Sequence, residues 1–286
     1  MAADYAIEDV LRRHGVEVER VLHVGAHIGQ EADCYRDLGA TDVIWVEGDP
    51  EVIPRLRDHV EPLGQRVFEA LLDTEPRRAI EFHRASNEMS SSLLAMGTHS
   101  VEHPEITTVG TVRLPTTTLD AVRGEARLGE IDLLVVDVQG AELRVLRGGE
   151  ETLAATGACY LEVNEAPLYE GCALLPEVEV FMDDHGFVLA ERTIGVHGYG
   201  DALFLRRSRY PRARRAISDF GATHGSEVPD ATRRRSPRHW VGQRFRGVVV
   251  SATEERFAGS DARLDRVLER LDAIESALAR IDRRLD

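Results

Sequence analysis

The chain has 286 residues, enough for one large α/β domain with an appendage. Hydrophobic residues make up 43% and charged residues 30%, a composition that excludes a disordered or fibrous protein. All 35 basic residues are arginine, which excludes Schiff-base, pyridoxal-phosphate and lysine-dependent P-loop or kinase chemistry.

The net charge of -15 is unevenly distributed. Residues 1–205 carry 16 arginines against 38 acidic residues, whereas residues 206–246 carry 12 arginines against 3. Phosphate repels so acidic a body, so we expect no nucleic-acid partner. The basic stretch predicts a solvated linker, with an anion-binding patch as the alternative.

The cell compartment follows from two further features. The acidic start, MAADYAIEDV, lacks the apolar segment of a signal peptide, and no run of about 18 apolar residues occurs anywhere. Cys34, Cys159 and Cys172 form no CxxC pair, which argues against a disulfide framework or a cysteine zinc site. We therefore predict a cytoplasmic protein with no transmembrane segment.

Apolar runs alternate with helical patterns along the first 206 residues. After an amphipathic helix at 4–14, strands are expected at 20–25, 43–47, 66–72, 131–137 and 158–163, and helices at 29–39, 50–60, 141–153 and 176–187. Nearly all-apolar strands are typical of a sheet covered on both faces. The order predicts an α/β fold with a doubly wound, mostly parallel sheet.

Three segments depart from this alternation. The pair 187–193 and 201–206 predicts a terminal antiparallel hairpin. The insert 74–120 is rich in Ser, Thr and His and is expected to be irregular, with one strand at 79–85. Apolar residues spaced three and four apart over 264–285 predict a coiled coil and a homo-oligomer, or else a helix folded back on its own domain.

These patterns divide the chain into three parts. We expect a catalytic domain over 1–206, an arginine-rich linker over 207–258 and a coiled-coil helix over 259–286.

Ligands of open α/β sheets bind at the carboxyl ends of the strands, so the residues after each apolar run are candidates. In HVGAHIGQ, Gly25 suits a tight turn and Gly29 lets a helix begin close to the strand. A pyrophosphate-binding GxGxxG loop needs glycine where His27 and Gln30 stand. A dinucleotide is therefore disfavoured, and a smaller nucleoside remains.

Acidic residues follow the other strands. Glu47 ends the second strand, where a carboxylate accepts hydrogen bonds from both ribose hydroxyls, although a surface acid is the alternative. Asp73 follows the third strand and is equally suited to an adenine amino group or to no ligand. Asp137 and Glu162, with Asn164 beside them, end the next two strands. Two such carboxylates raise one another's pKa and suit a base for a substrate hydroxyl, or they only orient a ligand.

These segments resemble the FkbM-type methyltransferases over about residues 18–206. The resemblance is carried by VLHVGAHIGQEADCYRDLGA, WVEGDP, SNEMSSSLL, TTTLDAV, IDLLVVDVQGAELRVLRGG, EVNEAPLYEG and GDALF. It implies a class I methyltransferase (Rossmann-like) fold, S-adenosyl-L-methionine (SAM) as methyl donor, and O-methylation of a hydroxyl on a sugar, glycan or secondary metabolite.

The resemblance also implies residue roles. The turn Gly25–Gly29, with Ala26 and His27, would hold the methionine end of SAM, and Glu47 its ribose. Asp137 and Ser90 to Ser92 would border the reaction site, with Ser91 on the donor side and Ser90 and Ser92 on the acceptor side. Apart from the resemblance, Asn164 and His197 are further acceptor-side candidates from their places in the chain, although His27 and His197 are alternatively ordinary loop histidines. His23 stands where many such enzymes place an acid for the SAM amino group, and Gln139 where a Glu is frequent.

The segment HSVEH at 99–103 matches the HxxEH pattern of zinc proteases. That pattern needs both histidines on one helical face and a third ligand, but Pro104 follows at once and no apolar periodicity surrounds the segment. We therefore expect no metal site.

Two functions remain as alternatives. The first is an active SAM-dependent O-methyltransferase, which Glu47, Asp137 and the Gly25–Gly29 turn favour. The second is a catalytically silent relative that acts as a scaffold through its basic linker and coiled coil, for which His23 is the argument.

Overall fold

The computed structural model describes residues 7–211. The predicted linker beyond residue 211 and the predicted coiled coil over 264–285 lie outside the described residues. None of the helices in the described range is long and apolar enough to cross a membrane.

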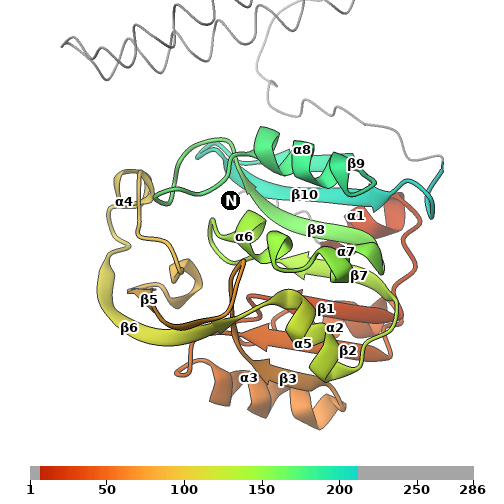
Figure 1. The fold of residues 1–286 in the computed structure, drawn as a ribbon, viewed down its shortest axis with the longest axis horizontal. Coiled ribbons are helices and arrows are strands. Elements are labelled where there is room, and N and C mark those ends of the chain that lie inside the picture. The colour runs from red at the N-terminus through yellow and green to blue at the C-terminus, as the bar shows by residue number, and fades with distance from the viewer. Residues whose placement is uncertain (1–6, 212–286) are drawn as a thin grey trace, which may run out of the picture. The chain divides into compact units, whose positions relative to one another are not determined.

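A seven-stranded sheet in the order β3-β2-β1-β7-β8-β10-β9 forms the centre of the fold (Figure 1). Its strands are β1 (Arg20–Val24), β2 (Asp42–Glu47), β3 (Arg66–Glu69), β7 (Ile131–Val136), β8 (Thr156–Asn164), β9 (Phe187–Ile194) and β10 (Tyr199–Arg206). The strands from β3 to β8 pair in parallel, and β10 lies antiparallel between β8 and β9. The mostly parallel sheet with a terminal antiparallel hairpin is thus confirmed.

Helices cover both faces of this sheet (Figure 1). On one face lie α5 (Leu119–Ala126), α6 (Glu142–Arg147), α7 (Glu150–Ala154) and α8 (Leu175–Asp184), and on the other α1 (Ile7–Arg13), α2 (Ala32–Asp37) and α3 (Ile53–Val60). Successive strand residues point to opposite faces, so Leu22 packs with the first group and Val21 with the second. Apolar residues at nearly every strand position therefore have a buried partner, as the doubly wound fold requires.

The insert is more regular than predicted. A second sheet in the order β4-β6-β5 is built from β4 (Leu71–Leu72), β5 (Arg77–Ala85) and β6 (Thr108–Thr117). Short helices η2 (Glu88–Ser90) and α4 (His99–Glu102) lie between β5 and β6, and η1 (Glu61–Leu63) follows α3. The expected strand at 66–72 is in fact divided, because Leu71 and Leu72 pair with β6 and leave the main sheet. This division displaces the residue that follows, Asp73.

Candidate functional site

Two adjoining cavities open at the carboxyl ends of β1, β2, β7 and β8. The narrow cavity lies between the end of β2 and the second sheet. The wide cavity, about 460 Å³, lies between the ends of β7, β8 and β10 and the segment around α4, a volume typical of ligand pockets. Gly25, His27, Asp137 and Gln139 line both, so the two cavities meet at the turns that follow β1 and β7.

The turn after β1 is held by its own backbone amides. The amides of Gly25 and Ala26 donate to the Val46 carbonyl oxygen at 3.0 and 3.1 Å, and that of His27 donates to Glu47 Oε2 at 2.8 Å. These three donors are engaged within the protein, so they do not form a phosphate cradle. A Cβ atom at Gly29 would lie 2.7 Å from Val60 Cγ1, which shows that this glycine serves the packing of α3 and lines neither cavity.

Glu47 lines the narrow cavity with its carboxylate fixed by three amides. Besides the amide of His27, those of Gly48 and Asp49 donate to Oε1 at 2.7 and 2.8 Å. Burial raises the pKa of Glu47, and these three hydrogen bonds oppose the shift. The rest of the cavity is largely apolar: Val24, Val46, Val52, Ala70, Leu71, Leu72, Phe82, Met89, Leu93, Val138 and Ala141. This cavity, about 70 Å³, thus combines a largely apolar lining with one oriented carboxylate.

His23 borders the wide cavity as a neutral side chain. It is buried, its Nδ1 lies 2.8 Å from the Tyr35 hydroxyl, and its ring centroid lies 4.9 Å from that of Trp45. Burial lowers the pKa of His23 to about 3. At neutral pH the imidazole is uncharged, so it offers a hydrogen bond rather than a charge.

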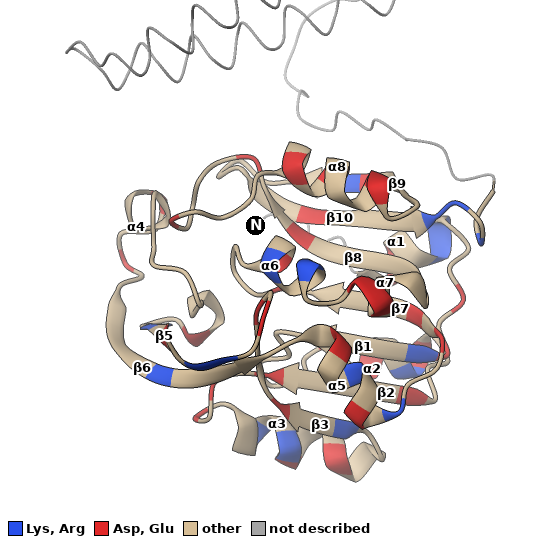
Figure 2. Ribbon diagram, viewed as in Figure 1, with Lys and Arg blue, Asp and Glu red and all other residues tan. Residues whose placement is uncertain are grey.

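Acidic residues gather at the floor of the wide cavity. Asp137, Glu162 and Asp201 line the wide cavity, and carboxylate oxygens of Asp137 and Glu162 lie within 4.8 Å of each other and of Glu142, which itself lines neither cavity. Glu162 faces Asp201 across β8 and β10, and each strand carries an acidic segment in Figure 2. Burial first, and then Asp137 and Glu142, raises the pKa of Glu162 well above its ordinary value. Burial also raises the pKa of Glu142 and of Asp201 to about 7. This floor is therefore able to hold and release protons near neutral pH.

Nitrogen atoms without partners form another part of the wall of the wide cavity. Among the described residues, His99 Nδ1, His103 Nε2 and Asn164 Nδ2 are buried without a hydrogen-bond partner, and all three side chains line the wide cavity. Asn164 is 1% exposed. Buried polar atoms normally have partners, so this wall is suited to a polar ligand. His197 does not line the cavity: its ring is tilted by 54° against that of His103, with the centroids 4.8 Å apart, and its Nδ1 lies 3.0 Å from Glu102 Oε2.

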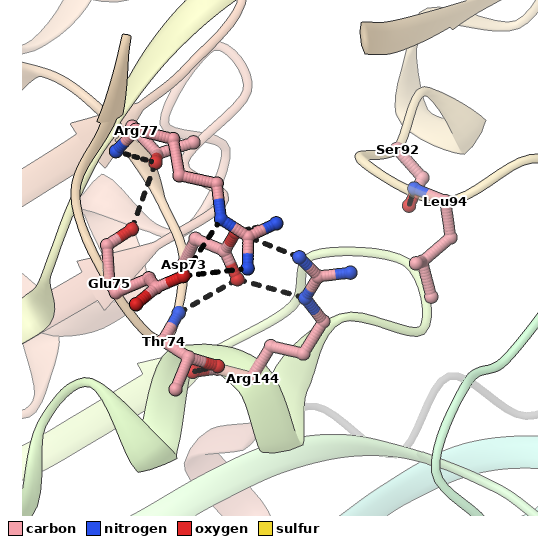
Figure 3. Close-up of polar contacts among 8 residues, drawn as sticks. Asp73, Thr74, Glu75, Arg77, Ser92, Leu94 and Arg144 are labelled. Atoms are coloured by element: carbon pink, nitrogen blue, oxygen red, sulfur yellow. Dashed lines mark hydrogen bonds and ion pairs between the residues drawn. The ribbon is translucent and has the colours of Figure 1, made fainter. Parts of the chain in front are cut away.

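The three serines of the insert have different surroundings. Ser90 lines the wide cavity and Ser91 the narrow one. Ser92 lines neither cavity. Its hydroxyl donates to the Gln139 carbonyl oxygen at 2.7 Å, and it accepts from the amide of Leu94, which lies beside it in Figure 3, at 3.0 Å. Ser92 thus ties the insert to the turn after β7.

Asp73 lies outside both cavities, which favours the alternative that it meets no ligand. Its fully buried carboxylate receives two hydrogen bonds from the Arg144 guanidinium, at 2.8 Å from Nε and 2.7 Å from Nη2 (Figure 3). The Thr74 amide donates to Oδ1 at 2.7 Å. Because β4 leaves the main sheet, Asp73 is directed to α6 and is an ion-pair partner, not a cavity residue.

Several cavity residues have no clear signal in the sequence. Asp201 begins an antiparallel strand, so the rule that selects carboxyl ends of parallel strands passes over it. His99 and His103 match a zinc pattern that the surrounding sequence does not support, and they line the wide cavity instead. Gln139 and Tyr169 lie in turns, and only the structure shows that their side chains meet.

Comparisons with known proteins identify a family and a relative. The family model described as "Methyltransferase FkbM domain" matches residues 23–189. A curated relative, "2-O-methyltransferase NoeI" from Sinorhizobium fredii (strain NBRC 101917 / NGR234), is 32% identical over 160 residues. The match covers 53% of this chain and 65% of NoeI, so the chain spans about two thirds of that relative's length.

Solved structures give more distant matches. A putative O-methyltransferase from Klebsiella pneumoniae aligns with a TM-score of 0.41 and 11% identity, covering 72% of this chain and 83% of the other. Magnesium protoporphyrin IX methyltransferase from Synechocystis PCC 6803, with bound S-adenosylhomocysteine (SAH), aligns with a TM-score of 0.41 and 10% identity, covering 70% and 80%.

Proposed function

The chain belongs to the FkbM methyltransferase family, and on this premise we propose that residues 1–206 form a class I, SAM-dependent O-methyltransferase. The observation that carries the proposal is the meeting of the narrow, Glu47-bearing cavity with the wide, acid-floored cavity at Gly25 and Asp137. Methylation of a hydroxyl is supported by the relative named as a 2-O-methyltransferase.

The narrow cavity fits the nucleoside part of SAM. Its apolar walls suit an adenine ring, and the fixed carboxylate of Glu47 retains one lone pair, on Oε2, for a ribose hydroxyl. SAM also carries positive charges on its sulfur and its amino group and one negative charge on its carboxylate, so its methionine end has a net positive charge. The described residues that line the wide cavity include Glu31, Asp137 and Glu162 but no arginine, which suits a cationic methionine end.

The wide cavity fits a hydroxyl-bearing acceptor beside that end. When bound, SAM supplies a methyl group whose bond to sulfur breaks, with the electron pair left on sulfur, as the acceptor oxygen bonds to carbon. The unpartnered nitrogens of His99, His103 and Asn164 are placed to hydrogen-bond further hydroxyls of a sugar, glycan or secondary metabolite. Asp137 and Glu162 are the carboxylates placed to accept the hydroxyl proton.

The test is a calorimetric titration of the full chain with SAM and SAH, with NAD as the control ligand. We expect binding of SAM and SAH in the micromolar range and no binding of NAD. Absence of binding to both SAM and SAH would reject the methyl-donor assignment and favour the catalytically silent scaffold.

Glu47→Ala tests the ribose assignment in the same titration. We expect SAM binding to weaken by about 1–3 kcal/mol, because the variant loses a ligand contact and leaves three amides without their acceptor. Glu69→Ala is the matched control, since Glu69 pairs with Glu47 in the sheet but is exposed and lines neither cavity. Equal affinities of wild type and Glu47→Ala would show that Glu47 does not hold the ribose.

Self-association through residues 264–285 is a separate part of the proposal, carried by the heptad spacing of their apolar residues. Truncation after Ser260 should therefore lower the mass measured by light scattering. If the truncated protein keeps the oligomeric state of the full chain, the proposed self-association is wrong, while the family assignment stands.

A further inference from the structure

Gln139 occupies a constrained turn directly after β7. Its φ is 55°, in the left-handed region that few residues other than glycine adopt. The Ser92 hydroxyl holds its carbonyl oxygen at 2.7 Å. Strained backbone of this kind is found mostly where the surrounding structure and function require it.

The side-chain amide of Gln139 joins two carboxylates. Its Nε2 donates to Asp137 Oδ1 at 2.7 Å and approaches both Glu162 oxygens at 3.1 Å. A primary amide has two N–H groups, so one serves each carboxylate. Its Oε1 accepts from the Tyr169 hydroxyl at 2.9 Å. Every polar atom of the side chain is thus used.

These partners also determine which way the amide points. The reversed orientation would place Oε1 against two carboxylates and would direct an N–H group at the Tyr169 hydroxyl. Oxygen facing oxygen without a proton is repulsive, so the N–H groups must face Asp137 and Glu162. Tyr169 is 2% exposed and approaches the position of a Cβ on Gly140 to 3.0 Å, so it has little freedom to turn away.

The amide stands among acids from four elements. The titratable groups of the surrounding elements are His23, His27, Glu31, His99, His103, Asp137, Glu142, Glu162, Tyr169, Tyr199 and Asp201. One oxygen of Glu142 is already held by the amides of Val138 and Gly140, at 3.0 Å each. The described residues that line this cavity include no arginine. The N–H groups of Gln139 are therefore the side-chain donors placed between the carboxylates of Asp137 and Glu162, where they reduce the repulsion between the two charges.

We propose that Gln139 is a positioning residue that bridges Asp137 and Glu162 and holds Glu162 in the form that accepts the proton of the acceptor hydroxyl. The role of the bridge in catalysis rests on the proposed methyl transfer, but the bridge itself is present in the protein without a ligand. A hydrogen bond to a carboxylate stabilises the charged form and so counteracts burial and the like charges around it. Gln139 therefore lowers the pKa of Glu162 below the value that burial and the neighbouring acids alone would give, and so favours the form that accepts a proton.

The test is a pH titration of the Glu162 carboxyl carbon by NMR in the full chain without ligand, with carbon-13-labelled glutamate and the signal assigned through Glu162→Gln. Gln139→Met keeps the length of the side chain and removes the amide. We expect the titration midpoint of Glu162 to rise by about one pH unit, a tenfold gain in proton affinity. Gln139→Glu, which adds a further carboxylate, should raise it more, and Tyr169→Phe should raise it less.

Gln65→Met is the matched control, because Gln65 Oε1 accepts a hydrogen bond from Trp45 Nε1 at 2.7 Å and Gln65 lines neither cavity. It should leave the Glu162 midpoint unchanged. If the titration midpoint of Glu162 in Gln139→Met and Gln139→Glu equals that of the wild type, the proposed bridge is wrong. If one of these variants does not fold, the midpoint measured in the other decides the question. SAM takes no part in the pH titration. Failure of the proposed function in the calorimetric test and failure of the bridge in the pH titration can therefore be told apart.

Discussion

Gly25→Ala should destabilise the domain by about 4 kcal/mol, since overpacking and left-handed strain add, and should abolish SAM binding. The φ of Gly25 is 82°, and a Cβ atom there would lie 1.7 Å from the Asp137 carbonyl oxygen. That oxygen belongs to backbone whose amide donates to the Val24 carbonyl oxygen at 3.0 Å, so it cannot move alone. The ends of β1 and β7 would have to separate where the two cavities meet. Urea unfolding measures the first effect and calorimetry the second.

Gly39→Ala is the matched control for this substitution. Gly39 also has a positive φ, of 93°, but no atom lies within 4 Å of the position of its Cβ. The free energy of unfolding of this variant should fall by only about 1 kcal/mol, the cost of placing alanine in the left-handed conformation. Equal losses in Gly25→Ala and Gly39→Ala would mean that close approach to Asp137 has no part in the effect.

The central sheet was predictable because its strands are apolar at almost every position. Val21 to Val24 and Ile131 to Val136 are buried on both faces, and such runs have few other solutions in a chain of this length. By contrast, β6 is mostly exposed and contains Pro115, so neither alternation nor apolarity marks it as a strand. Its partners in the second sheet, rather than its own residues, make it a strand.

The candidate site was predictable where parallel strands end. Glu47, Asp137 and Glu162 follow three such strands, and the structure brings all three to the two cavities. The same rule misplaced Asp73, because the two residues before it pair with β6 instead of continuing in the main sheet. Contacts such as those of Gln139 depend on turns with positive φ, which a sequence does not specify residue by residue.

Arg144→Met should lower the free energy of unfolding by about 3 kcal/mol, because it leaves the buried Asp73 carboxylate without its main partner. Arg77 remains, but its Nη1 lies 3.7 Å from Asp73 Oδ2 and its side chain is largely open to solvent. Urea unfolding at pH 7 measures the change. Arg57→Met, which removes an exposed pair with Glu61, is the control and should cost no more than about 0.5 kcal/mol.

The loss in Arg144→Met should depend on pH in a direction set by Asp73. Burial alone raises the pKa of this carboxyl, but hydrogen bonds from Arg144 and Thr74 together hold it below its usual value. The pair therefore contributes fully above about pH 4, the ordinary pKa of an aspartate, and its contribution is lost as the pH falls toward the lowered value. In the variant Asp73 is protonated more easily, so the gap to wild type should narrow under acid. The double variant Asp73→Asn, Arg144→Met should recover part of the lost stability at pH 7, because no charge then stays buried. A double variant no more stable than Arg144→Met would show that packing of the arginine side chain, not its charge, holds β4 to α6.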